Sequence, residues 1–271
     1  MTQIHQTVGM HHVAWILLAV GLVALIILLY HSVVVVSGAR LAVLERRWLG
    51  KKIPEGRVVA LSDEVGIQAR TLGPGLHILT PFIYKATKYP ILTVNEKEIA
   101  VVEAIDGQPI QAGRIFARRS EGHNLFQDGV SFIKDGGQKG PQIDIIPPGS
   151  YRINPYLFKI KKYPSTIIKS NEVGVVLAND GEPLTPGSLL GQHLEGHNHF
   201  QDGEAFLQKK GQKGPQLDIL LPGQYRINPE LFLVKIASTT VVPKSNIGIV
   251  NAESGLSLPK NEFVAQSVEG H

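Results

Sequence analysis

The sequence predicts a mainly β protein, with an N-terminal transmembrane helix followed by tandem β-rich repeat modules of about 74 residues. Three observations support this fold class. A long apolar run lies near the N-terminus, one block of sequence returns at a fixed spacing, and short β-branched segments alternate with glycine and proline. A fixed period indicates copies of one unit, and such copies are more typical of scaffolds than of enzymes.

The apolar run extends from Val13 to Val36 and is interrupted only by His31 and Ser32. As a helix it is long enough to cross a hydrocarbon core of about 30 Å. No Lys or Arg precedes the run, and it is longer than the apolar core of a secretory signal peptide. We therefore expect a tail over residues 1–12 and a retained transmembrane helix over residues 13–36.

Basic residues cluster only on the C-terminal side of this run, at Arg40, Arg46, Arg47, Lys51 and Lys52. Because Lys and Arg near the end of a span favour the cytoplasmic side, we expect a single-pass membrane protein whose C-terminal part is cytoplasmic. The two basic pairs also predict contact with anionic membrane lipids. A topology signal alone is the simpler interpretation of the same residues.

The repeat is clearest in a block that we call the Glu-Gly-His block. It spans residues 121–129, returns over residues 195–203, and begins again at Glu269-Gly270-His271. With its flanking sequence it predicts a shortened first β-module over 37–97, a second over 98–171, a third over 172–245 and a truncated fourth over 246–271. The fourth copy stops before its last strands, so we expect a longer protein; a natural end that pairs with another subunit is the alternative.

Within each module, β-branched segments predict strands at Ile99–Ile105, Val173–Ala178 and Ile247–Asn251. Asp106-Gly107 and Asp180-Gly181 are dipeptides typical of hairpin turns. After Val36, glycine and proline are too frequent for a convincing helical pattern, so we expect no further helix.

The Glu-Gly-His block also contains the residues that merit a test as a site. Glu121, His123 and Asp128 are of types that ligate metals or act as acid and base. A structured turn explains them better, with His123 bonded to backbone, Phe126 buried and Asp128-Gly129 closing a tight turn, because structural corners are copied with their surroundings more often than catalytic groups.

The segment from Gly136 to Gly140 resembles a phosphate-binding loop only faintly, since no helix and no Lys-Ser/Thr pair follows, and it predicts a mobile connection. The chain has no cysteine, which excludes disulfides, thiolate metal sites and cysteine nucleophiles. We therefore expect no enzyme, no catalytic, cofactor-binding or metal-binding residue, no cofactor and no nucleic-acid partner.

One stretch carries a resemblance to a known family. Gly73-Pro74-Gly75-Leu76-His77-Ile78-Leu79-Thr80-Pro81-Phe82-Ile83, soon after an N-terminal anchor, resembles the signature of the band 7 (SPFH) superfamily of stomatins, prohibitins, flotillins and HflK/C. The tandem repeats are similar to those of large flotillin-like proteins and to the stacked modules of the major vault protein. The family's mixed α/β domain and its long coiled coil have no counterpart in this sequence.

The resemblance implies a membrane-attached homo-oligomer that organises membrane patches, associated membrane proteases or other membrane proteins, and it implies no catalytic residues. We accordingly expect a non-catalytic scaffold of the flotillin type. The alternative is a membrane-tethered binding module that displays its repeated loops to a protein or polysaccharide partner.

Overall fold

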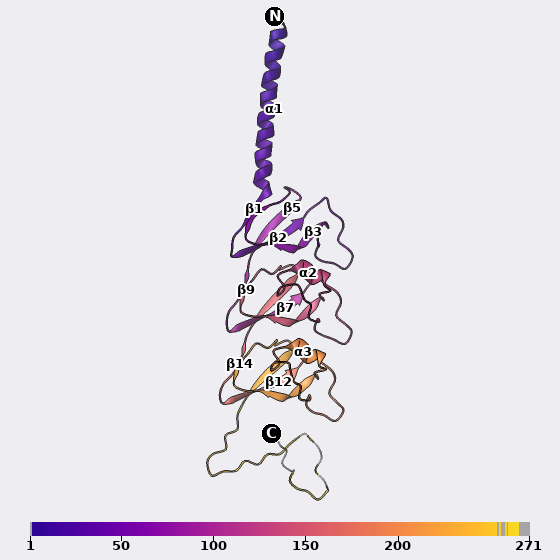
Figure 1. Ribbon diagram of the computed structural model, residues 1–271, viewed down its shortest axis with the longest axis vertical. Helices are drawn as coiled ribbons and strands as arrows, with labels where there is room; N and C mark the ends of the chain where they lie inside the picture. Colours follow the sequence, from indigo (N-terminus) through magenta and orange to yellow (C-terminus); the bar gives the residue numbers. More distant parts are fainter. Residues whose placement is uncertain (1, 254, 256–257, 259, 266–271) are drawn as a thin grey trace. The chain divides into compact units, whose positions relative to one another are not determined.

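The computed structural model describes residues 2–253, 255, 258 and 260–265, the first thirteen of these as backbone only. The chain is mainly β, as the sequence predicts, with one long helix near the N-terminus and two short ones (Figure 1). It forms two compact units, Met1–Pro164 and Ser165–His271, which are described separately below. The expected start of a further block at Glu269 lies outside the described residues.

Helix α1 spans Thr2–Ser32, so it includes most of the predicted tail and ends four residues before the predicted boundary at Val36. Val33–Val36 instead form strand β1, which pairs antiparallel with β4 (Gly75–Ile78). Four successive valines favour an extended backbone because branching at Cβ restricts their side-chain rotamers in a helix. The long helix therefore passes directly into the first β-ladder.

Three antiparallel sheets of three strands make up most of the β structure (Figure 1). The middle strands of the three sheets, in chain order, are β2 (Arg40–Arg46), β7 (Glu98–Ala104) and β12 (Glu172–Ala178). One set of outer strands is β3 (Gly66–Leu72), β8 (Gly140–Ile146) and β13 (Gly214–Leu220), and the other is β5 (Tyr84–Pro90), β10 (Phe158–Pro164) and β15 (Phe232–Ser238). Strands in each outer set recur at the spacing that separates the two Glu-Gly-His blocks in the sequence.

Short two-stranded ladders lie beside the sheets, β6 (Leu92–Val94) with β9 (Gly149–Tyr151) and β11 (Thr166–Ile168) with β14 (Gly223–Tyr225). Strands β7 and β12 cover the segments predicted at Ile99–Ile105 and Val173–Ala178. The strand predicted at Ile247–Asn251 is not formed, and Ile247, Ile249 and Val250 are almost fully exposed. β-branched residues stabilise a strand only beside a partner, and no described strand pairs with this segment.

Two local features recur in all three sheets and were not predicted. The ladder between the middle strand and β3, β8 or β13 shifts register at the same place, between Val43 and Glu45 and at the corresponding positions of β7 and β12. A buried glutamine on the same outer strand donates from Nε2 to two backbone carbonyls, four and two residues earlier; these glutamines are Gln68, Gln142 and Gln216. We call this pair of hydrogen bonds the glutamine clasp. Each sheet thus has the same β-bulge and the same glutamine clasp.

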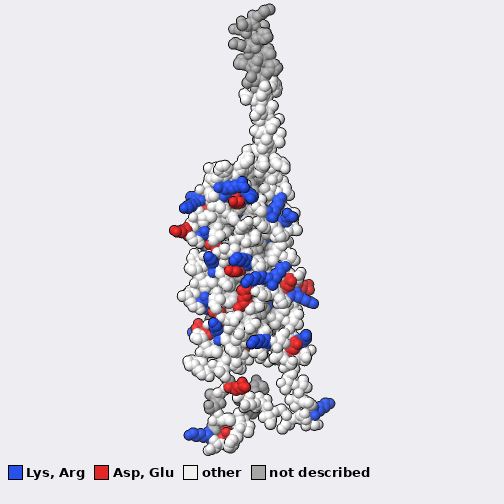
Figure 2. All heavy atoms as spheres, turned by 180° about the vertical axis from the view of Figure 1, so that it is seen from behind, with Lys and Arg blue, Asp and Glu red and all other residues white. Residues whose placement is uncertain are grey.

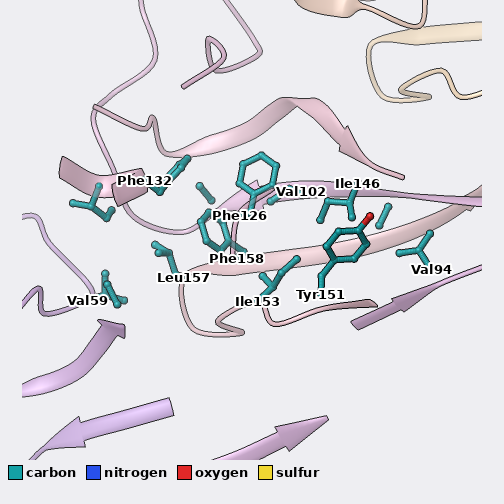
Figure 3. Packing of buried hydrophobic residues seen from close by; sticks show 14 residues of the cluster. Val59, Val94, Val102, Phe126, Phe132, Ile146, Tyr151, Ile153, Leu157 and Phe158 are labelled. Atoms are coloured by element: carbon teal, nitrogen blue, oxygen red, sulfur yellow. The ribbon is translucent and has the colours of Figure 1, made fainter. Parts of the chain in front are cut away.

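The second sheet packs on an aromatic core that includes Phe126, Phe132, Leu157 and Phe158 (Figure 3). Phe126 and Phe132 each meet the Phe158 ring edge-on, with centroids 5.3 and 4.9 Å apart. Phe200, Phe206 and Phe232 repeat this triangle beside the third sheet. Burial of three phenylalanines stabilises each core by several kcal/mol in total, at about 2–3 kcal/mol for each side chain.

Phe132 and Phe206 are supplied by short helices, which corrects the prediction that no helix follows Val36. Helix α2 spans Gly129–Lys134 and α3 spans Gly203–Gln208. Six residues are too few for a visible helical period, and an isolated helix of this length is unstable. These helices exist because a capping side chain and the aromatic core hold them in place.

The first and second sheets join within the Met1–Pro164 unit through a buried polar contact. Asp106, whose side chain is fully buried, accepts hydrogen bonds from the backbone N–H groups of Val58 (2.7 Å) and Val59 (2.9 Å) and pairs with Arg57 (3.2 Å). The Asp106-Gly107 dipeptide therefore does not make the predicted hairpin turn. It presents a carboxylate to the loop that precedes β3.

A second polar contact lies at the same junction. The Nδ2 group of Asn154 donates to the carbonyls of Gln68 (3.0 Å) and Ala69 (3.1 Å). A Cβ atom on Gly129, at the start of α2, would lie 2.8 Å from the Ala69 oxygen, so only glycine permits this approach. Val59 and Ala69 of the first part belong to the same buried cluster as Phe126 and Leu157 of the second (Figure 3).

Replacing Asp106 by Ala leaves three donors at this junction without their acceptor. We expect the free energy of unfolding of the Met1–Pro164 unit to fall by about 3 kcal/mol. Burial alone would raise the pKa of Asp106, but the hydrogen bonds from Val59, Val58 and Arg57 lower it below its ordinary value. The stabilisation is therefore complete above the unfolded pKa of about 3.9 and is lost as the pH falls through the folded pKa.

Urea unfolding of the detergent-solubilised chain measures this change. Asp144→Ala is the matched control, because it removes the partner of Arg119 (2.6 Å) in a partly exposed ion pair and should cost no more than about 1 kcal/mol. Equal losses in the two variants would contradict the role assigned to Asp106.

Candidate functional site

The backbone of the Glu-Gly-His block makes one turn of left-handed helix. Asn124, Leu125 and Phe126 have φ values of 46°, 50° and 64°, and the copy at Asn198, His199 and Phe200 has 48°, 50° and 63°. Asparagine tolerates this region, but other side chains lose about 1–2 kcal/mol each in it. Three successive residues persist there only when surrounding contacts enforce the conformation.

A buried histidine supplies the main enforcing contact. His123 Nδ1 accepts a hydrogen bond from the backbone N–H of Phe126 (2.9 Å), and its ring stacks on the Phe126 ring with centroids 4.4 Å apart. In the second copy His197 accepts from Phe200 at 2.8 Å, with the same centroid distance. Because Nδ1 accepts a hydrogen bond in both rings, each histidine adopts the tautomer in which Nδ1 carries no proton.

The acidic residue of the block caps a helix. Asp128 accepts from the backbone N–H groups of Val130 and Ser131, at 3.0 and 3.1 Å, and so begins α2. Desolvation opposes ionisation of Asp128, but the Ser131 backbone and hydroxyl donors and the Val130 N–H together hold its pKa below the ordinary value. The predicted tight turn at Asp128-Gly129 is thus a helix N-cap.

Gln127 ties the block to another repeated motif. Its Oε1 accepts from the backbone N–H of Arg152 (3.0 Å), just after β9, and Gln201 accepts from Arg226 (2.9 Å) in the same way. The block and the Tyr-Arg-Ile-Asn-Pro motif therefore meet in space, although they lie 25 residues apart in the chain. Both residues lie in repeated segments of the sequence, residues 121–129 and 151–155, but the sequence did not indicate that the two segments meet.

These contacts engage two of the three residues that were weighed as a metal or acid–base site. Glu121 is exposed, His123 is buried and bonded to backbone, and Asp128 is engaged at the start of α2. No group of three or more potential ligands that could hold a metal occurs among the described residues. The arrangement supports the interpretation of the block as a structured corner.

The loop from Gly136 to Gly140 is also held by its neighbours rather than free. The Gly137 carbonyl accepts from the Gln108 N–H (2.9 Å), and the Gln138 side chain accepts from the Arg118 N–H (2.8 Å). The segment predicted as a mobile connection is therefore hydrogen-bonded to the chain between β7 and α2.

One chemical difference distinguishes the two blocks. Beside the first block, Arg119 makes a two-pronged ion pair with Asp144. In the copy, His193 replaces the arginine, and its Nδ1 lies 2.7 Å from Asp218 Oδ1. The hydrogen bond to Asp218 raises the pKa of His193, whereas burial lowers the pKa of His197, whose Nε2 lies 4.0 Å from the other oxygen of Asp218.

A second candidate surface lies where α1 meets the first sheet. We define the α1-proximal edge as the exposed apolar side chains Trp48, Leu49, Ile78 and Phe82. The indole N–H of Trp48 donates to the Phe82 carbonyl (2.6 Å), and the Phe82 ring lies 5.6 Å from the ring of His31 in α1. Leu49 and Phe82 both have positive φ, at 56° and 64°.

Charged side chains lie beside this edge but leave its apolar side chains exposed. Arg47, Lys51 and Lys52 are exposed beside it, and Lys51 pairs with Asp63 at 3.1 Å. Figure 2 shows acidic and basic side chains interspersed over the β-rich part, while the described side chains of α1 carry no charge. The sequence indicated the basic residues, but Trp48 and Phe82 were missed because they lie far apart in the chain.

His123→Ala removes both the acceptor and the stacking partner that enforce the left-handed turn. We expect the unfolding free energy to fall by about 2–4 kcal/mol, measured by urea denaturation. Leu125→Gly tests the strain independently, since glycine relieves the φ of 50° and should stabilise the chain by up to about 1 kcal/mol. A destabilising Leu125→Gly would show that the turn is not strained.

The His193–Asp218 contact predicts a pH dependence that the Arg119–Asp144 contact lacks. The folded pKa of His193 is raised, so its stabilisation is present below the unfolded pKa of about 6.5 and is lost as pH rises through the folded pKa. The folded pKa of His197 is lowered, so its stabilisation is lost as pH falls. Glu195 and His199 act on the same groups through their charges.

His193→Arg should therefore remove the loss of stability above neutral pH and leave the loss at acid pH. Thermal melting between about pH 5 and pH 9, a range that spans the ordinary histidine pKa of about 6.5, checks this expectation. An unchanged profile above neutral pH would mean that the His193–Asp218 contact does not contribute to stability.

No protein-family model matches this chain, and no curated protein is similar enough to be reported as a relative. The resemblance to the band 7 superfamily accordingly stays a prediction from the Gly73–Ile83 stretch.

Proposed function

We propose that this chain is a non-catalytic, membrane-anchored scaffold of the band 7/flotillin type, built from tandem β-rich modules that assemble as a homo-oligomer. Its role is to organise membrane patches or associated membrane proteins, including membrane proteases. Its α1 helix is the anchor, and its C-terminal part faces the cytoplasm. The observation that carries the proposal is the exposed apolar surface of α1 and of the α1-proximal edge, which meet where His31 contacts Phe82.

The helix has the properties of an anchor. Trp15–Ser32 has a mean hydropathy of 2.3 and is long and apolar enough to cross a membrane. Its side chains are almost all exposed within the chain, for example Leu17 at 66% and Leu29 at 55%. Such a surface is unfavourable in water, where each apolar Å² costs about 25 cal/mol, and is accommodated by lipid.

The α1-proximal edge extends this surface to the sheet. Trp48, Leu49 and Phe82 have exposed fractions of 59%, 76% and 56%. Aromatic side chains beside Arg and Lys are typical of the headgroup region, where apolar rings and cations both find favourable surroundings. The edge therefore supports contact of the first sheet with the lipid surface.

The recurring geometry supports the division into modules. Outer strands that recur at the spacing of the sequence repeat, the same bulge in three middle strands and the same glutamine clasp are expected of copies of one unit. On this proposal the modules run over 37–97, 98–171 and 172–245, with a further copy beginning at 246. The missing Glu-Gly-His block makes the first copy shorter.

The contacts of the repeated polar groups favour a scaffold over the display of loops to a partner. His123, Asp128, Gln127 and Gln138 all bond to the chain's own backbone or are bonded by it. Groups engaged in this way are not presented to a protein or polysaccharide. Homo-oligomer formation rests on the family resemblance, and lateral contacts between equivalent modules are its simplest route.

The full chain should remain in the membrane after alkaline carbonate extraction, because an apolar span is released only by detergent. In detergent it should form particles of several subunits, measured by mass photometry with chemical crosslinking as a second measurement. A strict monomer at all concentrations would exclude the scaffold, whereas release by carbonate would exclude the anchor.

The double variant Trp48→Ser/Phe82→Ser tests lipid contact at the α1-proximal edge. Each residue removed from the interface should weaken lipid contact by about 1–2 kcal/mol, so protection of the 46–52 segment from hydrogen exchange should fall further in lipid nanodiscs than in detergent, where only the Trp48–Phe82 contact is lost. Ile167→Ser, at another exposed apolar residue (49%), is the control. Unchanged protection in nanodiscs would contradict lipid contact at this edge.

A further inference from the structure

The third sheet leaves one apolar face open. We propose that this face is a docking surface for another module of the same class, one that presents the carboxylate of an Asp-Gly dipeptide and the amide of an Asn-Pro corner. We call it the open face and define it by Val175, Leu177, Leu217, Ile219, Leu221 and Leu233. The inference rests on the proposed division into modules and adds to it a specific acceptor surface.

The two faces of the third sheet differ sharply in burial. Val176, Leu220 and Phe232, on the core side, are at most 1% exposed. On the opposite side Val175 pairs with Ile219 across the ladder, and these two side chains are 38% and 49% exposed. Contiguous apolar side chains on one side of a sheet mark a surface that is normally covered.

The corresponding face of the first sheet is covered. Val43 and Ala69, the equivalents of Val175 and Leu217 by strand and register, are 3% and 0% exposed. Leu217 is 56% exposed although its side chain is larger and more apolar than that of alanine. The residues that bury Ala69 come from the following part of the chain, with Leu157 and Phe126 in the same cluster.

Polar groups at the open face match those that receive the second sheet. In the first sheet the backbone N–H groups of Val58 and Val59 donate hydrogen bonds to Asp106. They lie just before Ala60, which forms an isolated β-bridge with Gln68. In the third, Leu189 and Leu190 stand just before the equivalent bridge between Gly191 and Gln216. Within the described residues the N–H groups of Leu189 and Leu190 have no hydrogen-bond acceptor.

The carbonyl groups are equivalent as well. Gln68 and Ala69 accept from the Asn154 side chain, and Gln216 and Leu217 occupy the same positions on β13. An occupant must therefore offer a carboxylate to two N–H groups, an amide to two carbonyls and a glycine for close approach. Residues 172–245 contain this set as Asp180, Asn228 and Gly203. Another module of the same class is the partner that this chemistry selects.

The chain contains no cysteine, so single cysteines report on the open face without background. The test compares Leu217→Cys in the full chain with Leu217→Cys in an extended chain, in which residues 1–245 are followed by a second copy of residues 172–245. Maleimide labelling in detergent should be at least about tenfold slower in the extended chain, because the added module covers the side chain. Ile236→Cys, exposed by 53% on the other side of the sheet, should label at the same rate in both.

Changing Asp180→Lys and Asn228→Ala in the added copy alone should restore fast labelling of Leu217→Cys. Equal labelling in the full and extended chains would overturn the proposal. Digestion of the added module by trypsin while the third sheet resists would also overturn the proposal, because it holds that a following module folds on this face. The number of subunits, measured on the same samples, distinguishes failure of this proposal from failure of the proposed function. If oligomers persist while Leu217→Cys labels equally fast in both chains, only the docking surface is overturned.

Discussion

The architecture of the Met1–Pro164 unit depends on burying two polar side chains against backbone groups of a neighbouring sheet. Asp106 and Asn154 enter a boundary that is otherwise apolar, and each satisfies two groups of the preceding segment. Left unpaired, such groups would cost more than the apolar contact gains, so the boundary forms only in one register. Apolar contact supplies most of the free energy, and the polar pair selects the arrangement.

The same division of roles appears within each Glu-Gly-His block. Three residues in left-handed conformation are unfavourable by themselves, and a buried histidine, an aromatic triangle and a glutamine compensate for them. The block is copied as a whole because its members are useful only together. His193 shows where variation is tolerated: the pairing with an acidic residue of the sheet is kept, while the partner changes from a permanent cation to a titratable one.

The sequence predicted the mainly β class, the apolar helix and the strands at β7 and β12, because periodic or β-branched segments depend on local preference. It did not predict α2 and α3, which need Asp128 or Asp202 and a distant aromatic core. Asp106 was assigned to a hairpin because Asp-Gly is a common turn signal, whereas its acceptor role depends on residues some 48 positions earlier. The α1-proximal edge was missed for the same reason, since only folding brings Trp48 to Phe82.

The first sheet lacks the Glu-Gly-His block and the short helix that follows it. In an array of repeats the outermost unit normally needs a polar outer surface, because water is its neighbour. The first sheet instead carries exposed aromatic and aliphatic side chains beside an apolar helix. On the proposed function, this sheet meets lipid rather than water, so the module that differs most from the others in sequence is also the one whose surroundings differ most.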